Sequence, residues 1–360
     1  MHFSVLFKRS GPGPLDRFFS CLVPLLGAFL LSGCSSLGYY SQLAQGQWQL
    51  LRARQPVDQV IVDPASSPRL RARLAHAEQA RAFASERLKL PDNRSYRLYA
   101  DLQRPYVVWN VFATPELSLQ PVTHCFPIAG CVAYRGYYRQ GAARGEAALM
   151  RQQGLDVYVS GVEAYSTLGW FDDPILSSMV AWGDERLATL IFHELAHQRF
   201  YVQDDTAFNE SFATFVEREG SRQWRAARGL APLGTVQSQQ REQFTRLVLA
   251  SRERLQAIYA APLDDAHKRA AKQAEFERLR AQYKQVRDSQ WGGDKRYDAW
   301  IYGPLSNAKL LPFGLYDQWV PAFERLFHEV GGDWPQFYRR VEELGHLPAA
   351  DRKAALQRLM

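Results

Sequence analysis

The sequence predicts a helix-rich α+β fold in which a small β-rich half precedes a helical half. Residues 95–117 are rich in Tyr, Val and Trp and indicate two strands, and residues 155–162 indicate another. From Gly183 to the end of the chain, apolar residues recur mostly at helical spacing. Strands and helices therefore occupy separate stretches of the chain, which is typical of an α+β protein.

The composition is that of a globular protein. The chain has 360 residues, of which 46% are hydrophobic and 22% charged, and it contains no internal repeat. We expect residues 34–360 to form a single domain, with a β-containing half at 34–182 and a helical half at 183–360. The net charge of +7 comes from scattered basic residues without interleaved aromatic residues, so nucleic acid is not an expected partner.

Within the β-rich half, the pattern predicts several further elements. Apolar spacing indicates helices at 37–55 and 68–89. The stretch "THCFPIAGCVAYRGYYR" indicates a tight hairpin, and "AYSTLGWF" (164–171) is a candidate for one more strand. An edge strand here would offer backbone hydrogen bonds to an extended peptide.

In the helical half, the pattern predicts two pairs of helices. The first pair consists of a helix at about 184–200 and a second that begins after Asp205, a favourable N-cap, and ends near Arg228. The charged segments 237–260 and 264–289 predict a long antiparallel helical hairpin. This hairpin, about 237–289, is either a solvated structural arm or a surface that binds a partner.

The N-terminus has the pattern of a bacterial signal peptide. Basic residues precede an apolar stretch at 18–31, which is short for a membrane-spanning helix. The stretch ends in "LSGC" (31–34), which resembles the lipobox of bacterial lipoproteins. That resemblance implies removal of residues 1–33 and attachment of fatty acids such as palmitate at Cys34. Ser35 favours the outer membrane, facing the periplasm of a Gram-negative cell; the alternative is an ordinary signal peptide.

The cysteines agree with export from the cytoplasm. Of the four, Cys21 leaves with the signal peptide and Cys34 carries the lipid. Cys125 and Cys131 remain, and an oxidising compartment favours a disulfide between them. Its short loop limits the entropic stabilisation to about 2 kcal/mol. The alternative is a pair of buried free thiols.

The stretch "HELAH" (193–197) is the strongest chemical signal. Side chains four residues apart lie on one face of a helix, so His193 and His197 can bind one metal ion. Glu194, between them, can reach a water molecule beside that ion. The chance of H-E-x-x-H in a chain of this composition is about one per cent. The alternative is a buried histidine pair with ordinary hydrogen-bond partners.

Glu210 can complete the site from the next helix. Packed helices lie about 8–10 Å apart, a distance that side chains can bridge through one ion. His193, His197 and Glu210 would leave a fourth position open, as catalytic zinc sites do. Glu217, two turns further on, either accepts a hydrogen bond from a histidine ligand or is a solvated surface charge.

The pattern "HELAH…FNESFATFVE" resembles the gluzincin metallopeptidases, the group of aminopeptidase N. The chain also closely resembles a bacterial family of zinc aminopeptidase lipoproteins, which shares the lipobox, "GYYSQLAQGQ", "CFPIAGCVAYRGYY" and "HELAHQ" over nearly the whole mature chain. These resemblances imply one Zn²⁺ held by His193, His197 and Glu210, with Glu194 as general base. Only twelve residues separate His197 from Glu210, fewer than in aminopeptidase N, so the connection must be tight.

Two further roles follow from the resemblance to aminopeptidase N. Glu163, two residues after Gly161, stands at the position of a glutamate that binds the free amine of the substrate; the alternative is a charge at the rim of the cleft. The transition-state oxyanion needs a hydrogen-bond donor, for which Tyr302 is the candidate, with Tyr297 behind it. With 17 tyrosines in the chain, simple packing is the alternative for either ring.

The sequence therefore predicts a zinc metallopeptidase that acts on peptide substrates. Zn²⁺ would polarise the scissile carbonyl, and Glu194 would move the proton of the attacking water to the leaving amine. An aminopeptidase attached to the membrane through Cys34 is the first hypothesis. The alternatives are a zinc endopeptidase that processes envelope peptides, or a non-catalytic lipoprotein that binds a partner through its helical arm.

Overall fold

The computed structural model describes residues 37–126, 130–164, 166–181, 183–231, 235–313 and 318–360. The chain divides into two compact units, residues 1–52 and 53–360. The described part of the first unit is a helix over residues 37–52. The predicted signal peptide and Cys34 lie outside the described residues. Within the described ranges, none of the helices is both long enough and apolar enough to span a membrane.

The strands of the second unit form small sheets. Their bounds are β1 Arg54–Pro56, β2 Leu98–Ala100, β3 Val108–Pro115, β4 His124–Phe126, β5 Gly130–Val132, β6 Tyr134–Tyr137, β7 Leu155–Val162 and β8 Ile175–Leu176. Their orders are β1–β2–β8, β6–β3–β7 and β4–β5, with β7 at the edge of its sheet. The strands expected at 155–162 and within 95–117 are confirmed.

The helices of the second unit make up most of it. Their bounds are α2 Val57–Val62, α3 Pro68–Glu86, α4 Gln140–Gln152, α5 Ser177–Val180, α6 Asp184–Arg199, α7 Thr206–Ala227, α8 Thr235–Ala260, α9 Asp265–Gln290, α10 Asp298–Ile301, α11 Asn307–Leu310, α12 Val320–Glu329, α13 Trp334–Gly345 and α14 Ala349–Arg358. The helix-rich α+β class is therefore confirmed, and α6 and α7 begin and end close to their predicted bounds.

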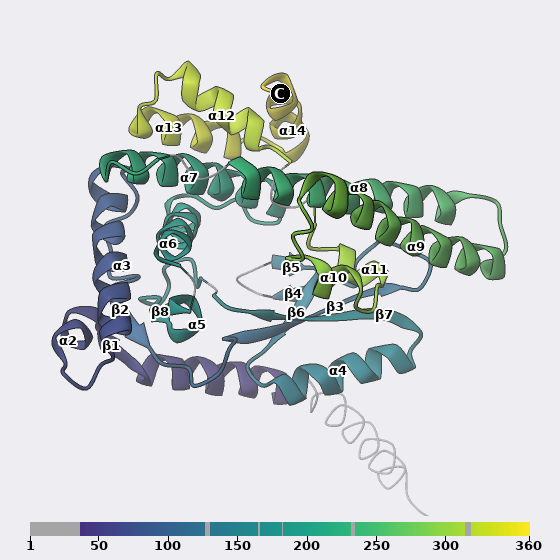
Figure 1. The fold of residues 1–360 in the computed structure, drawn as a ribbon, viewed down its shortest axis with the longest axis horizontal. Helices are drawn as coiled ribbons and strands as arrows, with labels where there is room; N and C mark the ends of the chain where they lie inside the picture. Colours follow the sequence, from purple (N-terminus) through teal and green to yellow (C-terminus); the bar gives the residue numbers. More distant parts are fainter. Residues whose placement is uncertain (1–36, 127–129, 165, 182, 232–234, 314–317) are drawn as a thin grey trace, which may run out of the picture. The chain divides into compact units, whose positions relative to one another are not determined.

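Helix α6 packs between α3 and α7, and the view in Figure 1 looks nearly along its axis. Aromatic rings cover α7 from the C-terminal helices: Phe215 lies 5.0 Å from Phe337 between ring centroids, and Phe212 lies 5.8 Å from Phe323. Apolar contacts thus hold α6 on several sides.

The sheet β6–β3–β7 is packed by α4 and α11, which lie below and above it in Figure 1.

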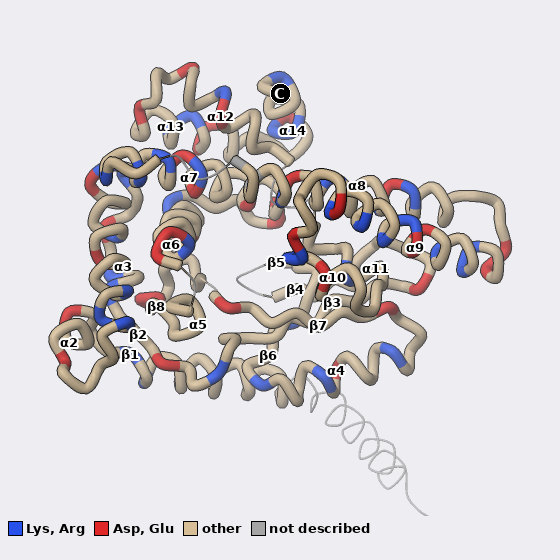
Figure 2. Tube along the Cα trace, in the orientation of Figure 1, with Lys and Arg blue, Asp and Glu red and all other residues tan. Residues whose placement is uncertain are grey.

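The predicted helical hairpin is confirmed as α8 and α9, which pack together along their length (Figure 1). Its core includes the fully buried Phe244, Leu255 and Leu279. Acidic and basic residues are interspersed along both helices (Figure 2). The buried Lys272 of α9 donates to Asp156 of β7 at 2.7 Å, so the hairpin is anchored to the sheet.

One local expectation needs correction. The stretch "AYSTLGWF" is not a strand in its described residues, 166–171; it forms a turn. Leu168 and Gly169 have φ of 56° and 81°, and Thr167 donates to the carboxylate of Asp173 at 2.7 Å. Left-handed residues cannot continue a strand, and Thr and Asp side chains stabilise such turns. In the larger sheet the edge strands are β6 and β7.

Helix α4 was not expected from the sequence. Its buried side chains are only Ala143, Ala147 and Met150, one turn apart on one face. The helix contains Gly141 and Gly145, and glycine is unfavourable inside a helix, so the local sequence argued against a helix here. Its contact with β7 and β3 stabilises it.

Candidate metal centre

Helix α6 carries the two histidines on its buried side. Leu187, Ile191 and Leu195 are fully buried and hold the helix in the core. Asp184 and Glu185 lie in its first turn, where negative charge interacts favourably with the helix dipole. His193 and His197 are 8% and 7% exposed, so their rings are withdrawn from bulk solvent. Buried imidazoles need polar partners, and these come from α7.

The connection from α6 to α7 is tight, as expected from the sequence. Asp205 caps α7, because its side chain accepts a hydrogen bond from the Phe208 N–H at 3.0 Å. The buried side chain of Asn209 accepts from the Val202 N–H at 2.8 Å and donates to the Val202 carbonyl at 2.7 Å. This clamp folds the connection back on the start of α7 and places the next residue, Glu210, beside α6.

The ligand atoms of His193, His197 and Glu210 converge on one point. The two Nε2 atoms lie 3.1 Å apart, and Glu210 Oε2 lies 3.4 Å from that of His193 and 3.7 Å from that of His197. An ion about 2.0–2.2 Å from three tetrahedral ligands separates them by roughly 3.3–3.6 Å. The observed separations bracket this range. These three residues can therefore hold a metal ion.

The hydrogen bonds around the site agree with this geometry. Glu210 Oε2 and His197 Nδ1 are buried without a hydrogen-bond partner among the described residues. Glu210 Oε2 lies 3.4 and 3.7 Å from the two ring nitrogens, which is longer than a normal N–H···O hydrogen bond. Buried oxygen atoms rarely lack a partner. Two imidazole nitrogens and a carboxylate oxygen are a donor set that suits Zn²⁺, so the residues present fit the expected ion.

Glu217 orients the first histidine. Its Oε2 lies 2.9 Å from Nδ1 of His193, so it accepts the proton on that nitrogen and leaves the Nε2 lone pair for an ion. Without an ion, burial opposes protonation of His193, but Glu210 and Glu217 raise its pKa well above the ordinary value. An ion that binds at Nε2 therefore replaces a proton on that nitrogen. Burial alone would raise the pKa of Glu210, yet its contacts with His193 and His197 lower that pKa to about 2.

Glu194 follows His193 on α6 and is partly buried. Burial is the main reason that its pKa is raised; the two histidines lower this pKa, and Glu210 and Asp173 raise it. A carboxylate whose pKa is moved towards neutral pH is better suited to accept and return a proton. The position and the environment of Glu194 are therefore compatible with a general base.

The other predicted side chains have different surroundings. The Glu163 carboxylate lies 3.5 Å from Arg186, in the first turns of α6, and is partly exposed. Tyr302 is 46% exposed, and its ring lies 6.0 Å from that of Tyr283 in the hairpin. Tyr297 stacks on Phe244 at 3.9 Å, which is a packing role. The substrate-binding role of Glu163 and the catalytic role of Tyr302 stay predictions.

Tyr201 is a neighbour of the site that sequence reasoning missed. It follows α6, four residues after His197, and its ring lies edge-on to the His197 ring with centroids 6.4 Å apart. Its side chain is 36% exposed. Burial raises the pKa of Tyr201, and the charges of Glu210 and Asp204 raise it further, so the phenol stays a hydrogen-bond donor. Helical spacing gave no signal for it, because α6 ends at Arg199 and Phe200 is extended.

The disulfide predicted between Cys125 and Cys131 is confirmed, and it closes the hairpin β4–β5. This hairpin contacts the connection between α6 and α7. The Cys131 N–H donates to Asp204 Oδ1 at 3.2 Å. Gly130 has φ of 70°, and a Cβ atom there would collide with the Asp204 carboxylate. The disulfide hairpin therefore supports the connection that carries Tyr201.

Comparison with known proteins identifies one family. Residues 38–356 match the profile of a family described as "Putative aminopeptidase". No curated protein and no solved structure gives a significant match. The matched residues include the two histidines, Glu194, Glu210 and the disulfide hairpin. Because the match extends over nearly the whole chain, the protein belongs to this putative aminopeptidase family.

Proposed function

We propose that this protein is a zinc-dependent peptidase that removes residues from the N-terminus of peptides. One observation carries the proposal: the ligand atoms of His193, His197 and Glu210 lie within 4.8 Å of one another. Glu194 follows the first of these histidines on the same helix. The description of the family supports the peptidase class. A structural zinc site has four protein ligands, whereas three ligands and an adjacent carboxylate are typical of hydrolysis.

In this proposal, His193 and His197 hold Zn²⁺ through Nε2, and Glu210 holds it through a carboxylate oxygen. The ion, when bound, supplies Lewis acidity to the scissile carbonyl and to water. Glu217 keeps His193 in the tautomer that leaves Nε2 free. Glu194 takes a proton from the attacking water on its carboxylate and delivers it to the leaving amine.

A tyrosine hydroxyl is proposed to stabilise the developing oxyanion. Tyr302 is the candidate from the sequence, but its ring packs with Tyr283 of the hairpin. The contact of Tyr201 with His197 favours Tyr201 instead, because a donor must lie within reach of the reacting carbonyl. Its partial exposure would let its hydroxyl meet a substrate that enters from solvent.

Recognition of the free amine is assigned to Glu163. In the structure this carboxylate pairs with Arg186, and both side chains are partly exposed. An exposed ion pair contributes little stability, so a substrate ammonium group can replace Arg186 at small cost. Glu163→Gln should therefore raise KM for substrates with a free amine more than it lowers kcat.

The test is a panel of aminoacyl fluorogenic substrates and N-terminally blocked peptides. We expect turnover of the free-amine substrates, loss of turnover after chelation, and recovery when zinc is added. Turnover restricted to blocked peptides would show an endopeptidase. If the zinc-loaded protein turned over none of these substrates, the alternative of a non-catalytic binding protein would be favoured.

The matched variant for this test is Glu194→Gln, which keeps the shape of the side chain. It should retain zinc and lose roughly 10²–10⁴-fold in turnover, because a general base is removed. Glu185→Gln on the same helix is the control, since Glu185 pairs with Arg225 at 3.0 Å and should not affect turnover. Unchanged turnover in Glu194→Gln would reject the general-base role.

We also propose a lipid anchor at Cys34 and a position on the periplasmic side of the outer membrane. The support is the sequence "LSGC" followed by Ser35. Cys34→Ser should release the protein from membranes into the soluble periplasmic fraction. Continued sedimentation of this variant with outer-membrane markers would rule out the anchor.

A further inference from the structure

Tyr96 combines two features that are unfavourable for stability. Its backbone has φ of 63°, in the left-handed region that large side chains rarely adopt. Its side chain is 2% exposed, and the phenol oxygen has no hydrogen-bond partner among the described residues. Buried hydroxyl groups are nearly always paired. Strain and an unpaired buried group at one residue often mark a functional position.

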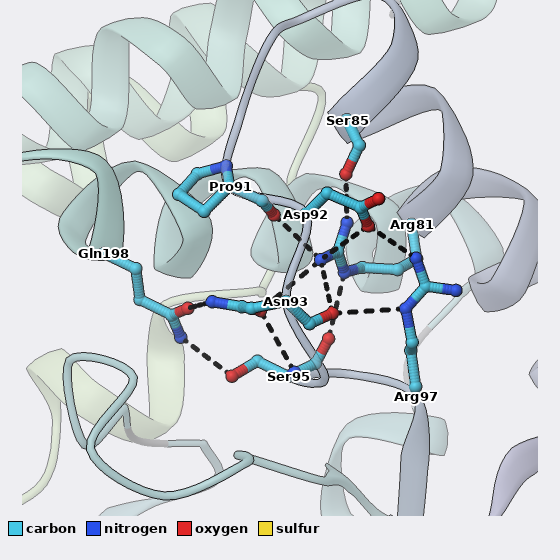
Figure 3. Close-up of polar contacts among 8 residues, drawn as sticks. All are labelled: Arg81, Ser85, Pro91, Asp92, Asn93, Ser95, Arg97 and Gln198. Atoms are coloured by element: carbon cyan, nitrogen blue, oxygen red, sulfur yellow. Dashed lines mark hydrogen bonds and ion pairs between the residues drawn. The ribbon is translucent and has the colours of Figure 1, made fainter.

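Several hydrogen bonds fix the backbone that leads into Tyr96. The buried guanidinium of Arg81 donates to the carbonyl oxygens of Pro91, Asn93 and Ser95 at 2.8, 3.0 and 2.9 Å (Figure 3). The Tyr96 N–H donates to the carbonyl oxygen of Asp173 at 2.7 Å. Segment 91–96 is therefore held rigidly against its neighbours.

The same segment is attached to the metal-binding helix. Asn93 Nδ2 donates to Gln198 Oε1 at 2.7 Å, and Gln198 Nε2 donates to Ser95 Oγ at 3.3 Å (Figure 3). Gln198 lies four residues after Glu194 on α6, so the two side chains share one face of the helix. Glu194 therefore faces segment 93–96, whereas His193 and His197 face α7.

The electrostatics agree with this placement. Burial raises the pKa of Tyr96 well above its usual value, and the charges of Glu194 and Asp173 raise it further. The phenol is thus a neutral donor next to a carboxylate. Ser166 is also close to the phenol, but the two hydroxyl groups form no hydrogen bond with one another, and the Ser166 hydroxyl donates to Asp173 at 3.3 Å.

We propose that Tyr96 is a positioning residue for Glu194, whose carboxylate accepts a hydrogen bond from the Tyr96 hydroxyl when substrate is bound. This inference rests on the proposed peptidase function. One carboxylate oxygen is then held by Tyr96, and the other stays free to take the proton of the attacking water. Catalytic hydrogen bonds are often too long in the absence of substrate and shorten in the complex.

The test compares Tyr96→Phe with Tyr338→Phe in the full-length zinc-loaded protein. Tyr338 is equally buried, but its hydroxyl donates to the Leu88 carbonyl at 2.7 Å. Tyr96→Phe should lower kcat roughly 10–100-fold, as loss of an orienting partner does. Its KM, zinc content and unfolding temperature should be maintained, because no existing hydrogen bond is lost. Tyr338→Phe should lower the unfolding temperature and leave kcat unchanged.

A double variant separates positioning from a structural role. If Tyr96 acts through Glu194, Tyr96→Phe should have no further effect on the residual turnover of Glu194→Gln. An equal loss in both backgrounds, or an unchanged kcat in Tyr96→Phe, would overturn the inference while the peptidase proposal stands. A wild-type protein that holds zinc but turns over no substrate would overturn both. If Ser166→Ala lowered kcat as much as Tyr96→Phe, the hydrogen bond of the Tyr96 hydroxyl would be assigned to Ser166 and not to Glu194.

Discussion

Two helix pairs in this molecule bury carboxylates, and they do so in different ways. In the hairpin, Glu275 of α9 is 4% exposed and accepts from Arg254 of α8 on both oxygens at 2.9 Å. In the α6–α7 pair, Glu210 Oε2 is buried without a hydrogen bond and faces two imidazole nitrogens. A buried charge with a complete set of partners belongs to the architecture. A buried carboxylate oxygen that has no hydrogen bond, although two imidazole nitrogens lie beside it, is better explained by an ion.

The largest expected effect is on the α6–α7 pair. His193→Ala removes one of three ligand atoms, so zinc should no longer be retained and metal-dependent turnover should disappear. Elemental analysis after dialysis measures the metal, and the substrate panel measures the turnover. A full zinc equivalent in this variant would show that the ion binds elsewhere, and the contrast with the hairpin would lose its basis.

The next largest effect distinguishes Tyr201, beside the metal site, from Tyr302, beside the hairpin. Tyr201→Phe keeps the ring against His197 and removes only the hydroxyl, so kcat should fall roughly 10²–10³-fold with zinc retained. Tyr302→Phe, next to Tyr283 in the hairpin region, should leave kcat unchanged. Steady-state kinetics of both variants decide between them. The reverse result would restore the assignment made from the sequence.

A smaller effect is expected at the orienting carboxylate. Glu217→Gln weakens the hydrogen bond that fixes the tautomer of His193, so zinc affinity should fall about 10–100-fold. Competition with a chelating dye measures this affinity. Glu219→Gln on the same helix is the control, because Glu219 pairs with Arg222 at 2.6 Å. Equal affinities for Glu217→Gln and the wild type would place Glu217 among the structural charges.

The smallest effect on activity should come from the hairpin. Glu275→Gln breaks a complete pair with Arg254 and should cost about 1–3 kcal/mol of stability without a change in turnover. Glu242→Gln, in the exposed pair with Arg246, should cost no more than about 0.5 kcal/mol. Denaturant unfolding measures both. A clear loss of turnover in Glu275→Gln would show that the hairpin contributes to the site.

Much of the helical half could be predicted from the sequence because the signals are local. The apolar period predicted α6, and the capping preference of Asp205 predicted the start of α7. The Cys125–Cys131 disulfide was also predictable, because these are the only two cysteines after Cys34 in the sequence. The turn at 166–171 was missed, since its aromatic composition resembles a strand while Asp173 and Thr167 stabilise a turn.

The surroundings of the site could not be predicted in the same way. Tyr96 and Gln198 lie in separate segments of the chain, and neither has a distinctive sequence pattern. Their connection depends on Arg81, whose buried guanidinium holds segment 91–95 close to α6. Residues that act through contacts across the fold leave no periodic signal in a single sequence.

The sequence by itself determined that His193 and His197 share one face of a helix, because the helical period is a property of the local backbone. It also determined that Glu194, the residue after His193, points in another direction and cannot bind the ion at the same position as the histidines. Only the tertiary structure decided that Glu210 meets those imidazoles and that Asn93 and Ser95 meet Gln198 of the same helix. Those meetings depend on how α3, α6 and α7 pack, and packing is set by side chains distant in the sequence.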